Sequence, residues 1–299
     1  MENTEPTKYT LMPELYINVT AVKWFSICAN ILRDVRGSFP GGPTEDQQFL
    51  DLGCGPGKIT RDVLLPQCPP CRRLVAVDSS EDMLRYARER FSHPKVCYDT
   101  LDIVSDDLSD FVGRYGLFDR VYALNLLNWL KDQEQALKHI AKLMKPGGEA
   151  LITFNASNPQ MRFRKKLAAM PRWSKYAKIC ESCTPPTVDL AGKEALVSYV
   201  RIILKNANLT PSMCEVRSRL YDPLADMDRF ISFTASVTKH LRSCARIEDN
   251  VKDGVWEVNE DNVKNNVYTL FHLMMYRRKS YKRELLALGH ISAAQALVR

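Results

Sequence analysis

The hydrophobic pattern changes near residue 48, which separates an amino-terminal helix from an alternating α/β region. Over residues 15–35 an apolar side chain recurs at every third or fourth position, the spacing that places one stripe along a helix. The stripe consists of Ile17, Ala21, Trp24, Cys28, Ile31 and Val35. We therefore expect a helix that packs one face on the rest of the protein and ends before Gly37.

From Gln48 onward, short apolar runs alternate with amphipathic helical segments. The runs predicted as strands are FLDLG (49–53), LVAVD (74–78), KVCYDTLDI (95–103), FDRVYALNLL (118–127) and EALITFN (149–155). Helices are expected from Lys58, after Ser79 and from Lys131, and a KPGG turn (145–148) precedes the last run. Strands with intervening helices form βαβ units. The pattern thus predicts a doubly wound, Rossmann-like α/β fold with a mostly parallel sheet.

After Asn155 the alternation stops for a basic stretch of some forty residues that contains four prolines. Beyond it the pattern predicts a helix over 194–207, a strand over 211–221, a helix over 224–237 and a long apolar strand over 266–276. The final segment, 285–299, is weakly amphipathic and is expected to pack loosely. These elements predict a seven-stranded sheet. They also divide the chain into three regions, which are an amino-terminal helical arm (1–45), a ligand-binding core (46–156), and a helical substrate cap with the last strands and tail (157–299).

Composition narrows the class of protein. The 299 residues are 45% hydrophobic and 26% charged, which is enough to bury a core and excludes wholesale disorder. The polar start lacks the pattern of a signal peptide, and no stretch approaches the ~20 uninterrupted apolar residues of a membrane helix. We expect a cytoplasmic protein with reduced cysteines. Its two CxxC pairs, at 68–71 and 180–183, lie more than a hundred residues apart, so no metal site is expected.

The most informative segment is DLGCGPGK, at residues 51–58. Its glycines alternate between a predicted strand and a predicted helix, so a ligand can approach the backbone closely. A dinucleotide fingerprint requires glycine at its sixth position, where this chain has Lys58. Asp78 ends the next strand 21 residues after Gly57, where a carboxylate can accept ribose hydroxyls. Each acidic residue taken alone could instead cap a helix or turn.

With Asp51 ahead of GxGxG, the segment resembles the S-adenosylmethionine site of class I methyltransferases. In that family an acidic residue after the third strand meets the adenine amino group, and Leu101-Asp102-Ile103 stands at this place. The resemblance implies S-adenosylmethionine as the cofactor. It also implies a cofactor site at the carboxyl ends of successive strands, composed of Asp51, Gly53, Cys54, Gly55, Gly57, Asp78, Ser79, Asp102, Ile103 and Asn125.

A second resemblance concerns the substrate. Residues 127–136 (LNWLKDQEQA), with DLGCGPG, VAVDSSEDML, LDI and VYTLFHLMMYRRK, resemble the arthropod juvenile hormone acid and farnesoic acid carboxyl methyltransferases over roughly residues 15–280. The resemblance implies that Trp129 lines the substrate cleft, although this Trp could instead pack its helix on the sheet. Two features depart from the family. Asn128 replaces its His, and no Gln precedes Gln47, whereas the family uses an amino-terminal Gln to contact the carboxylate.

The implied reaction is carboxyl O-methylation of a small lipophilic acid, with Trp129 and Asn128 as substrate contacts. A carboxylic acid with a pKa near ~4–5 is ionised at neutral pH. We therefore expect no catalytic base, and the enzyme's work is positioning and desolvation. The net charge of +7 includes a run at 161–179 with seven basic and no acidic residues, and a second cluster at 277–283. These are solvated faces, sites that attract an anionic substrate, or docking sites for phosphates or membranes.

Three alternatives stay open: a methyltransferase for another small molecule, an RNA methyltransferase, and a non-catalytic cofactor-binding protein. Enzymes that methylate the exocyclic amines of bases have an (Asp/Asn)-Pro-Pro-(aromatic) motif after the fourth strand, where residues 123–129 read ALNLLNW. No RNA-binding module is evident either. We therefore expect no nucleic-acid partner. The sequence does not predict the oligomeric state.

Overall fold

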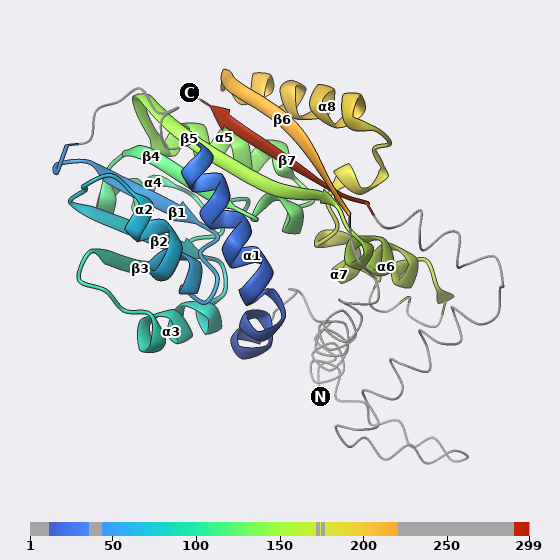
Figure 1. The fold of residues 1–299 in the computed structure, drawn as a ribbon, viewed down its shortest axis with the longest axis horizontal. Coiled ribbons are helices and arrows are strands. Elements are labelled where there is room, and N and C mark those ends of the chain that lie inside the picture. Colours follow the sequence, from blue (N-terminus) through green and yellow to red (C-terminus); the bar gives the residue numbers. More distant parts are fainter. Residues whose placement is uncertain (1–11, 36–43, 172–173, 175–176, 221–289, 299) are drawn as a thin grey trace, which may run out of the picture.

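The computed structural model describes residues 12–35, 44–171, 174, 177–220 and 290–298 (Figure 1). The amino-terminal stripe forms α1 (Pro13–Val35), as predicted. The elements of the core are β1 (Gln48–Leu52), η2 (Thr60–Leu64), α2 (Leu65–Gln67), β2 (Arg73–Asp78), α3 (Glu81–Arg90), β3 (Val96–Thr100), α4 (Ser109–Tyr115), β4 (Phe118–Leu124), η3 (Leu127–Trp129), α5 (Gln133–Leu143) and β5 (Met144–Ser157). They are followed by α6 (Pro159–Ala168), α7 (Ala177–Ser182), η5 (Pro186–Asp189), α8 (Lys193–Asn206), β6 (Pro211–Leu220) and β7 (His290–Val298).

The strands form one sheet in the order β3-β2-β1-β4-β5-β7-β6. Strands β1 to β5 are parallel, as the βαβ pattern predicted. The prediction for the last segment was wrong. Residues 290–298 form β7, which pairs antiparallel with both β5 and β6. Three alanines give this segment a weak hydrophobic signal, whereas pairing on two sides satisfies its backbone N–H and C=O groups. The helix predicted over 224–237 and the strand predicted over 266–276 lie outside the described residues.

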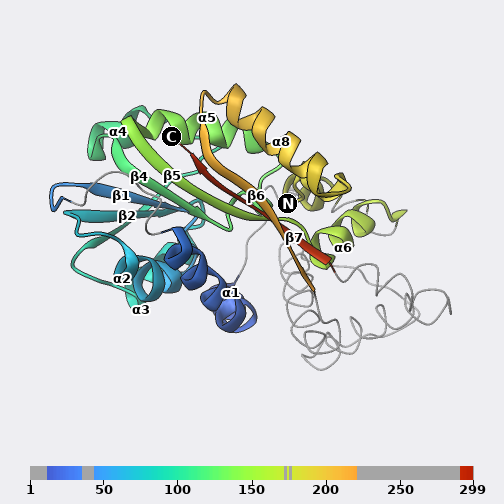
Figure 2. The ribbon, with the colours of Figure 1, turned by 45° about the horizontal axis from the view of Figure 1, so that its top comes forward.

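Helices cover both faces of the sheet (Figure 2). The strand periodicity of two explains why both faces are apolar. In β1, Leu50 and Leu52 belong to the cluster that includes residues of α4, α5 and α8, whereas Phe49 belongs to the cluster with α1 and η2. Asp51 shares the second face with Phe49 by this periodicity. The strand therefore brings a carboxyl group beneath the helix that the amino-terminal stripe predicted.

Two local predictions need correction. LDI does not close the third strand, because β3 ends at Thr100. The N–H of Asp102 donates to Asp106 Oδ2 at 2.6 Å and its own Oδ1 accepts from the N–H of Val104 at 3.2 Å, so side chains turn the backbone away from the sheet. The KPGG segment lies within β5 as a bulge. Pairing with β4 jumps there from Met144 to Glu149, and Gly147 has a φ of 74°.

The strand order creates the crevice in which open α/β sheets bind ligands. β1 lies between β2 and β4, so the connections from its carboxyl end and from that of β4 run in opposite directions and leave a gap. The segment after β5 leads into α6 and α7, which lie beyond one end of the sheet (Figures 1 and 2). No helix in the described ranges is long and apolar enough to cross a bilayer.

Candidate functional site

The loop after β1 can be made only by glycine at two of its positions. Gly53 and Gly57 have φ values of 76° and 81°, a conformation that L side chains avoid. A Cβ at Gly53 would lie 2.8 Å from Leu126 Cδ1, and one at Gly57 would lie 2.7 Å from Ala87 Cβ. The alternating glycines thus let the loop pass between the segment after β4 and helix α3.

Asp78, the last residue of β2, holds the loop from the other side. Its Oδ2 accepts a hydrogen bond from the N–H of Gly55, and its Oδ1 accepts one from the N–H of Ser80, both at 2.9 Å. The carboxylate orientation is therefore set by backbone groups on two loops. Ser79 lies exposed between them, and the side chain of Ser80, rather than Ser79, caps α3 by accepting from Met83 N.

Asp51 lies beneath the loop and is 3% exposed. Its Oδ2 accepts a hydrogen bond from Thr60 Oγ1 at 2.6 Å. Burial raises the pKa of this carboxyl to about 7, an effect that the Thr60 hydrogen bond partly opposes. Asp51 is thus close to the point at which it gains or loses a proton at neutral pH.

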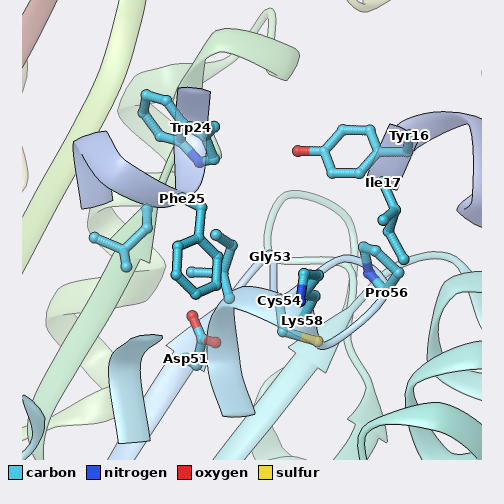
Figure 3. A pocket seen from close by; sticks show the side chains of 11 residues that line it. Tyr16, Ile17, Trp24, Phe25, Asp51, Gly53, Cys54, Pro56 and Lys58 are labelled. Carbon is cyan, nitrogen blue, oxygen red and sulfur yellow. The ribbon is translucent and has the colours of Figure 1, made fainter. Parts of the chain in front are cut away.

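A cavity of about 500 Å³, open to solvent, lies between α1 and the loop (Figure 3). Apolar and aromatic side chains line it together with Asp51 and Lys58. The hydroxyl of Tyr16 points toward the space between the helix and the loop. Burial raises the pKa of Tyr16 to about 12, and a side-chain hydrogen bond with Asn125 lowers it by less. Helix α1 therefore forms the wall opposite the glycines.

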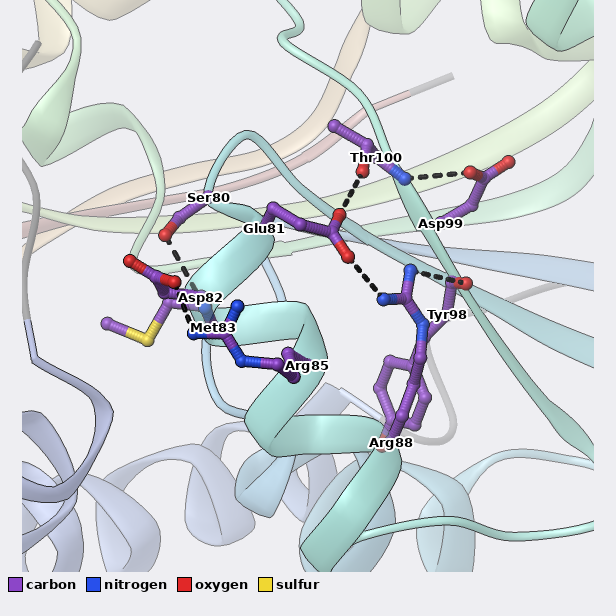
Figure 4. Close-up of polar contacts among 9 residues, drawn as sticks. All are labelled: Ser80, Glu81, Asp82, Met83, Arg85, Arg88, Tyr98, Asp99 and Thr100. Atoms are coloured by element: carbon purple, nitrogen blue, oxygen red, sulfur yellow. Dashed lines mark hydrogen bonds and ion pairs between the residues drawn. The ribbon is translucent and has the colours of Figure 1, made fainter.

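The end of β3 is held to α3 by polar contacts (Figure 4). Glu81, at the start of α3, accepts from Thr100 Oγ1 at 2.7 Å and pairs with Arg88. On the other side, His139 Nδ1 of α5 lies 2.8 Å from the carbonyl oxygen of Ile103. The N–H of Leu101 also donates to the carbonyl oxygen of Asp78 at 3.2 Å, so the segment that contains Asp102 and Ile103 starts beside the end of β2.

Three residues after β4 form one hydrogen-bonded unit. Asn125 has a φ of 66°, and its Oδ1 accepts from Asn155 Nδ2 at 2.8 Å. With the amide of Asn128 in the orientation that satisfies both ends, its nitrogen lies 2.7 Å from Asn125 Oδ1 and its oxygen accepts from Trp129 Nε1 at 2.9 Å. The amide of Asn128 therefore supports the indole of Trp129. The expected contacts of Trp129 and Asn128 with a substrate stay a prediction.

The structure brings the expected cofactor residues together around the ends of β1, β2 and β4. The sequence reasoning missed Tyr16, Thr60 and His139. Tyr16 lies one position before the apolar stripe of α1, and Thr60 lies nine residues beyond Asp51, so neither has a one-dimensional signal. His139 belongs to no motif of the sequence, and only the structure shows it buried on α5 beside the carbonyl oxygen of Ile103.

Comparisons with known proteins agree with this geometry. A family model described as a methyltransferase domain matches residues 50–150. Juvenile hormone acid O-methyltransferase of Bombyx mori is 27% identical over 225 residues, which cover 74% of this chain and 78% of that protein. Trans-aconitate 2-methyltransferase of Variovorax paradoxus is 33% identical over 132 residues, or 44% and 48% of the two chains. The fold matches phosphoethanolamine N-methyltransferase 2 of Haemonchus contortus with a TM-score of 0.52 at 16% identity, over 98% of this chain and 58% of that one.

The family match shows a methyltransferase domain over residues 50–150, and together with the glycine loop it supports a class I S-adenosylmethionine-dependent methyltransferase. Within that class it resembles the juvenile hormone acid O-methyltransferases. Its cofactor is S-adenosylmethionine. The residues fit this molecule. A Cβ at Gly53 or Gly57 would collide with neighbouring atoms. In the cavity, the carboxyl group of Asp51 can accept a hydrogen bond from the ammonium group of the methionine part, and Lys58, which also pairs with Asp62 at 2.8 Å, has the charge opposite to its carboxylate.

Proposed function

We propose that the chain is a carboxyl O-methyltransferase that esterifies a lipophilic acid such as farnesoic acid or juvenile hormone acid. The observation that carries the proposal is the placement of Trp129. Leu126 lies against Gly53 of the cofactor loop, and Trp129 follows three residues later with its indole held by Asn128. This places a half-buried aromatic surface on the segment that borders the cofactor loop. Such a surface suits an apolar chain that carries a reactive polar end.

The chain's residues have three tasks in the proposed reaction. Bound S-adenosylmethionine would supply an electrophilic methyl group on a sulfonium centre. Asp78 would accept the ribose hydroxyls, and the segment at Asp102 and Ile103 would border the adenine. Trp129 would hold the apolar part of the acid, and α6 and α7 would serve as the cap that excludes water. A carboxylate is ionised at neutral pH, so the residues must position and desolvate it rather than remove a proton.

The test is methyl transfer from labelled S-adenosylmethionine to a panel of farnesoic acid, juvenile hormone acid, trans-aconitate and bulk RNA. We expect labelled methyl esters of the lipophilic acids. Exclusive labelling of trans-aconitate would move the assignment to short polycarboxylates, for which the Variovorax relative supplies a precedent by name. Cofactor binding without labelling of any acid would reject carboxyl methylation.

A substitution at Trp129 separates substrate contact from simple packing. We expect Trp129→Ala to lower kcat/KM for the acid by roughly tenfold or more, with the affinity for S-adenosylmethionine unchanged. Trp129→Phe is the matched control, because it keeps an aromatic ring and loses the pyrrole ring with the N–H that Asn128 binds. Unchanged kinetics for Trp129→Ala would place the acid elsewhere.

A further inference from the structure

Few charged side chains are buried in the part of the chain that the structure describes. They are Asp51, Arg120, Glu149 and Arg164. Arg120 pairs with Glu149 at 3.1 Å across β4 and β5, and Asp51 lies under the glycine loop. Arg164 belongs to the basic run at 161–179, lies on α6 and is 5% exposed. It is thus the buried cation on the segment that begins where β5 ends.

Arg164 lies against the aromatic residue that borders the cofactor loop. Its guanidinium carbon is 4.8 Å from the centre of the Trp129 ring, within the range of a cation–π interaction. Asn128 fixes the same ring through its N–H. The guanidinium therefore has a defined position relative to the end of β4, and through Leu126 relative to Gly53.

Two neighbours of Arg164 in the basic run are engaged elsewhere. Arg162 is exposed and its Nε donates to Ser157 Oγ at 3.1 Å. Lys165 is exposed and forms an ion pair with Asp189. Arg162 and Lys165 are thus exposed, whereas Arg164 between them is buried. An exposed ion pair such as that of Lys165 contributes little free energy in water. A buried charge interacts more strongly with a ligand, because solvent and salt screen it much less.

The thiols beside Arg164 do not supply a negative charge. Arg164 acts electrostatically on Cys180 and makes a side-chain hydrogen bond with Cys183. Burial nevertheless raises the pKa of Cys183, and it raises the pKa of Cys180 to about 11. Both thiols are therefore neutral at pH 7 and do not neutralise the positive charge of the guanidinium.

We infer that Arg164 anchors the carboxylate of the substrate and thereby selects acids over neutral lipids. This inference rests on the proposed function and deepens it. A guanidinium presents N–H donors in a planar fork that matches the two oxygens of a carboxylate. With the guanidinium on one face of Trp129, a single site can hold the apolar chain and the charged end of one molecule. It would take the task of the glutamine that this chain lacks before residue 47.

The test is equilibrium binding, which does not depend on turnover. Farnesoate and its neutral amide are titrated into the protein saturated with S-adenosylhomocysteine. We expect wild-type protein to prefer the acid over the amide, and Arg164→Gln to lose roughly 10- to 100-fold in affinity for farnesoate while its affinity for the amide changes little. Arg164→Lys keeps the charge without the fork and should bind farnesoate with intermediate affinity.

Lys165→Gln is the matched control, because it removes the same charge from the next residue of α6. It should leave the binding of farnesoate unchanged. Equal loss in Arg164→Gln and Lys165→Gln would overturn the inference in favour of a general charge effect, as would equal loss of acid and amide. If Arg164→Gln does not fold with cofactor bound, the comparison of Arg164→Lys with Lys165→Gln decides.

Failure of the proposed function gives a different result. Wild-type protein that binds farnesoate but transfers no methyl group to it would reject the carboxyl methyltransferase, while the preference for acid over amide would still support Arg164 as the anchor. Wild-type protein that binds farnesoate no better than its amide would overturn the role of Arg164 even if other acids are methylated.

Discussion

The two sides of the crevice between β1 and β4 are built from different contacts. On the side of β1 and β2, the main chain makes the site, because glycines and one carboxylate interlock two loops. On the side of β4 and β5, side chains make it, as Asn128 positions an indole and Arg164 lies on its face. A main-chain site tolerates few substitutions, whereas side-chain walls can change with the substrate. In the proposed reaction the first side thus holds the cofactor and the second side holds the acceptor.

The largest expected effect comes from Asp78→Ala. This change removes the acceptor for the N–H groups of Gly55 and Ser80 as well as the proposed ribose contact. We expect the affinity for S-adenosylmethionine, measured by calorimetry, to fall by about 100-fold or more, since each lost hydrogen bond to a charged group costs ~1.5–3 kcal/mol. Asp78→Asn keeps one acceptor oxygen, so its affinity for S-adenosylmethionine should lie between those of wild type and Asp78→Ala. Wild-type affinity in Asp78→Ala would show that the main chain alone suffices.

The next largest effect is the loss of stability when a side chain is added to the glycine loop. Gly57→Ala places a methyl group 2.7 Å from both Ala87 Cβ and Tyr98 Oη at a φ of 81°. We expect a loss of about 2–4 kcal/mol in the free energy of unfolding by urea. Gly113→Ala in α4 is the control, because nothing lies within 4 Å of its new Cβ. It should be neutral or stabilising by up to ~1 kcal/mol, and similar losses at both glycines would contradict the steric argument.

Asn128→Ala tests whether the two sides act separately. It removes the partner of the Trp129 N–H inside a buried unit, so we expect a loss of about 1–3 kcal/mol in stability and slower acid turnover. The affinity for the cofactor should stay within about twofold. Asn206→Ala, which breaks an exposed bond to Glu134, should change stability by no more than ~0.5 kcal/mol. Loss of cofactor affinity in Asn128→Ala would show that the two sides are energetically coupled rather than separate.

The smallest effect concerns the proton on Asp51. Its pKa in the folded protein is about 7, above the value near ~4 of an exposed carboxyl, so folding favours the protonated form. The stabilisation is complete below ~4 and is lost as the pH rises through about 7. Urea unfolding of cofactor-free protein at pH 6 and pH 8 should therefore show wild type losing on the order of 1–2 kcal/mol relative to Asp51→Asn. Parallel curves would mean that Asp51 is ionised at both pH values.

Much of the cofactor side was predictable because each of its features is local in the chain. The runs before Gly53 and up to Asp78 read as buried strands, and the structure ends β1 and β2 at Leu52 and Asp78. The end of β3 was not predictable, because two side-chain hydrogen bonds divert the main chain at Asp102. The N–H of Asp102 donates to the carboxylate of Asp106, and the N–H of Val104 donates to that of Asp102. β7 was missed because its pairing partners, β5 and β6, lie seventy or more residues away in the chain.

By itself the sequence determined the parallel α/β core, the amino-terminal helix and the class of cofactor, because strand and helix periods and a glycine loop are written in consecutive residues. Only the tertiary structure decided what surrounds the proposed acceptor site. It placed Tyr16 of α1 over Gly55, directed the Trp129 N–H to Asn128, and set Arg164 apart from the exposed Arg162 and Lys165 by burying it on the indole. Burial and orientation depend on which distant segments pack together, and no single stretch of sequence contains that information.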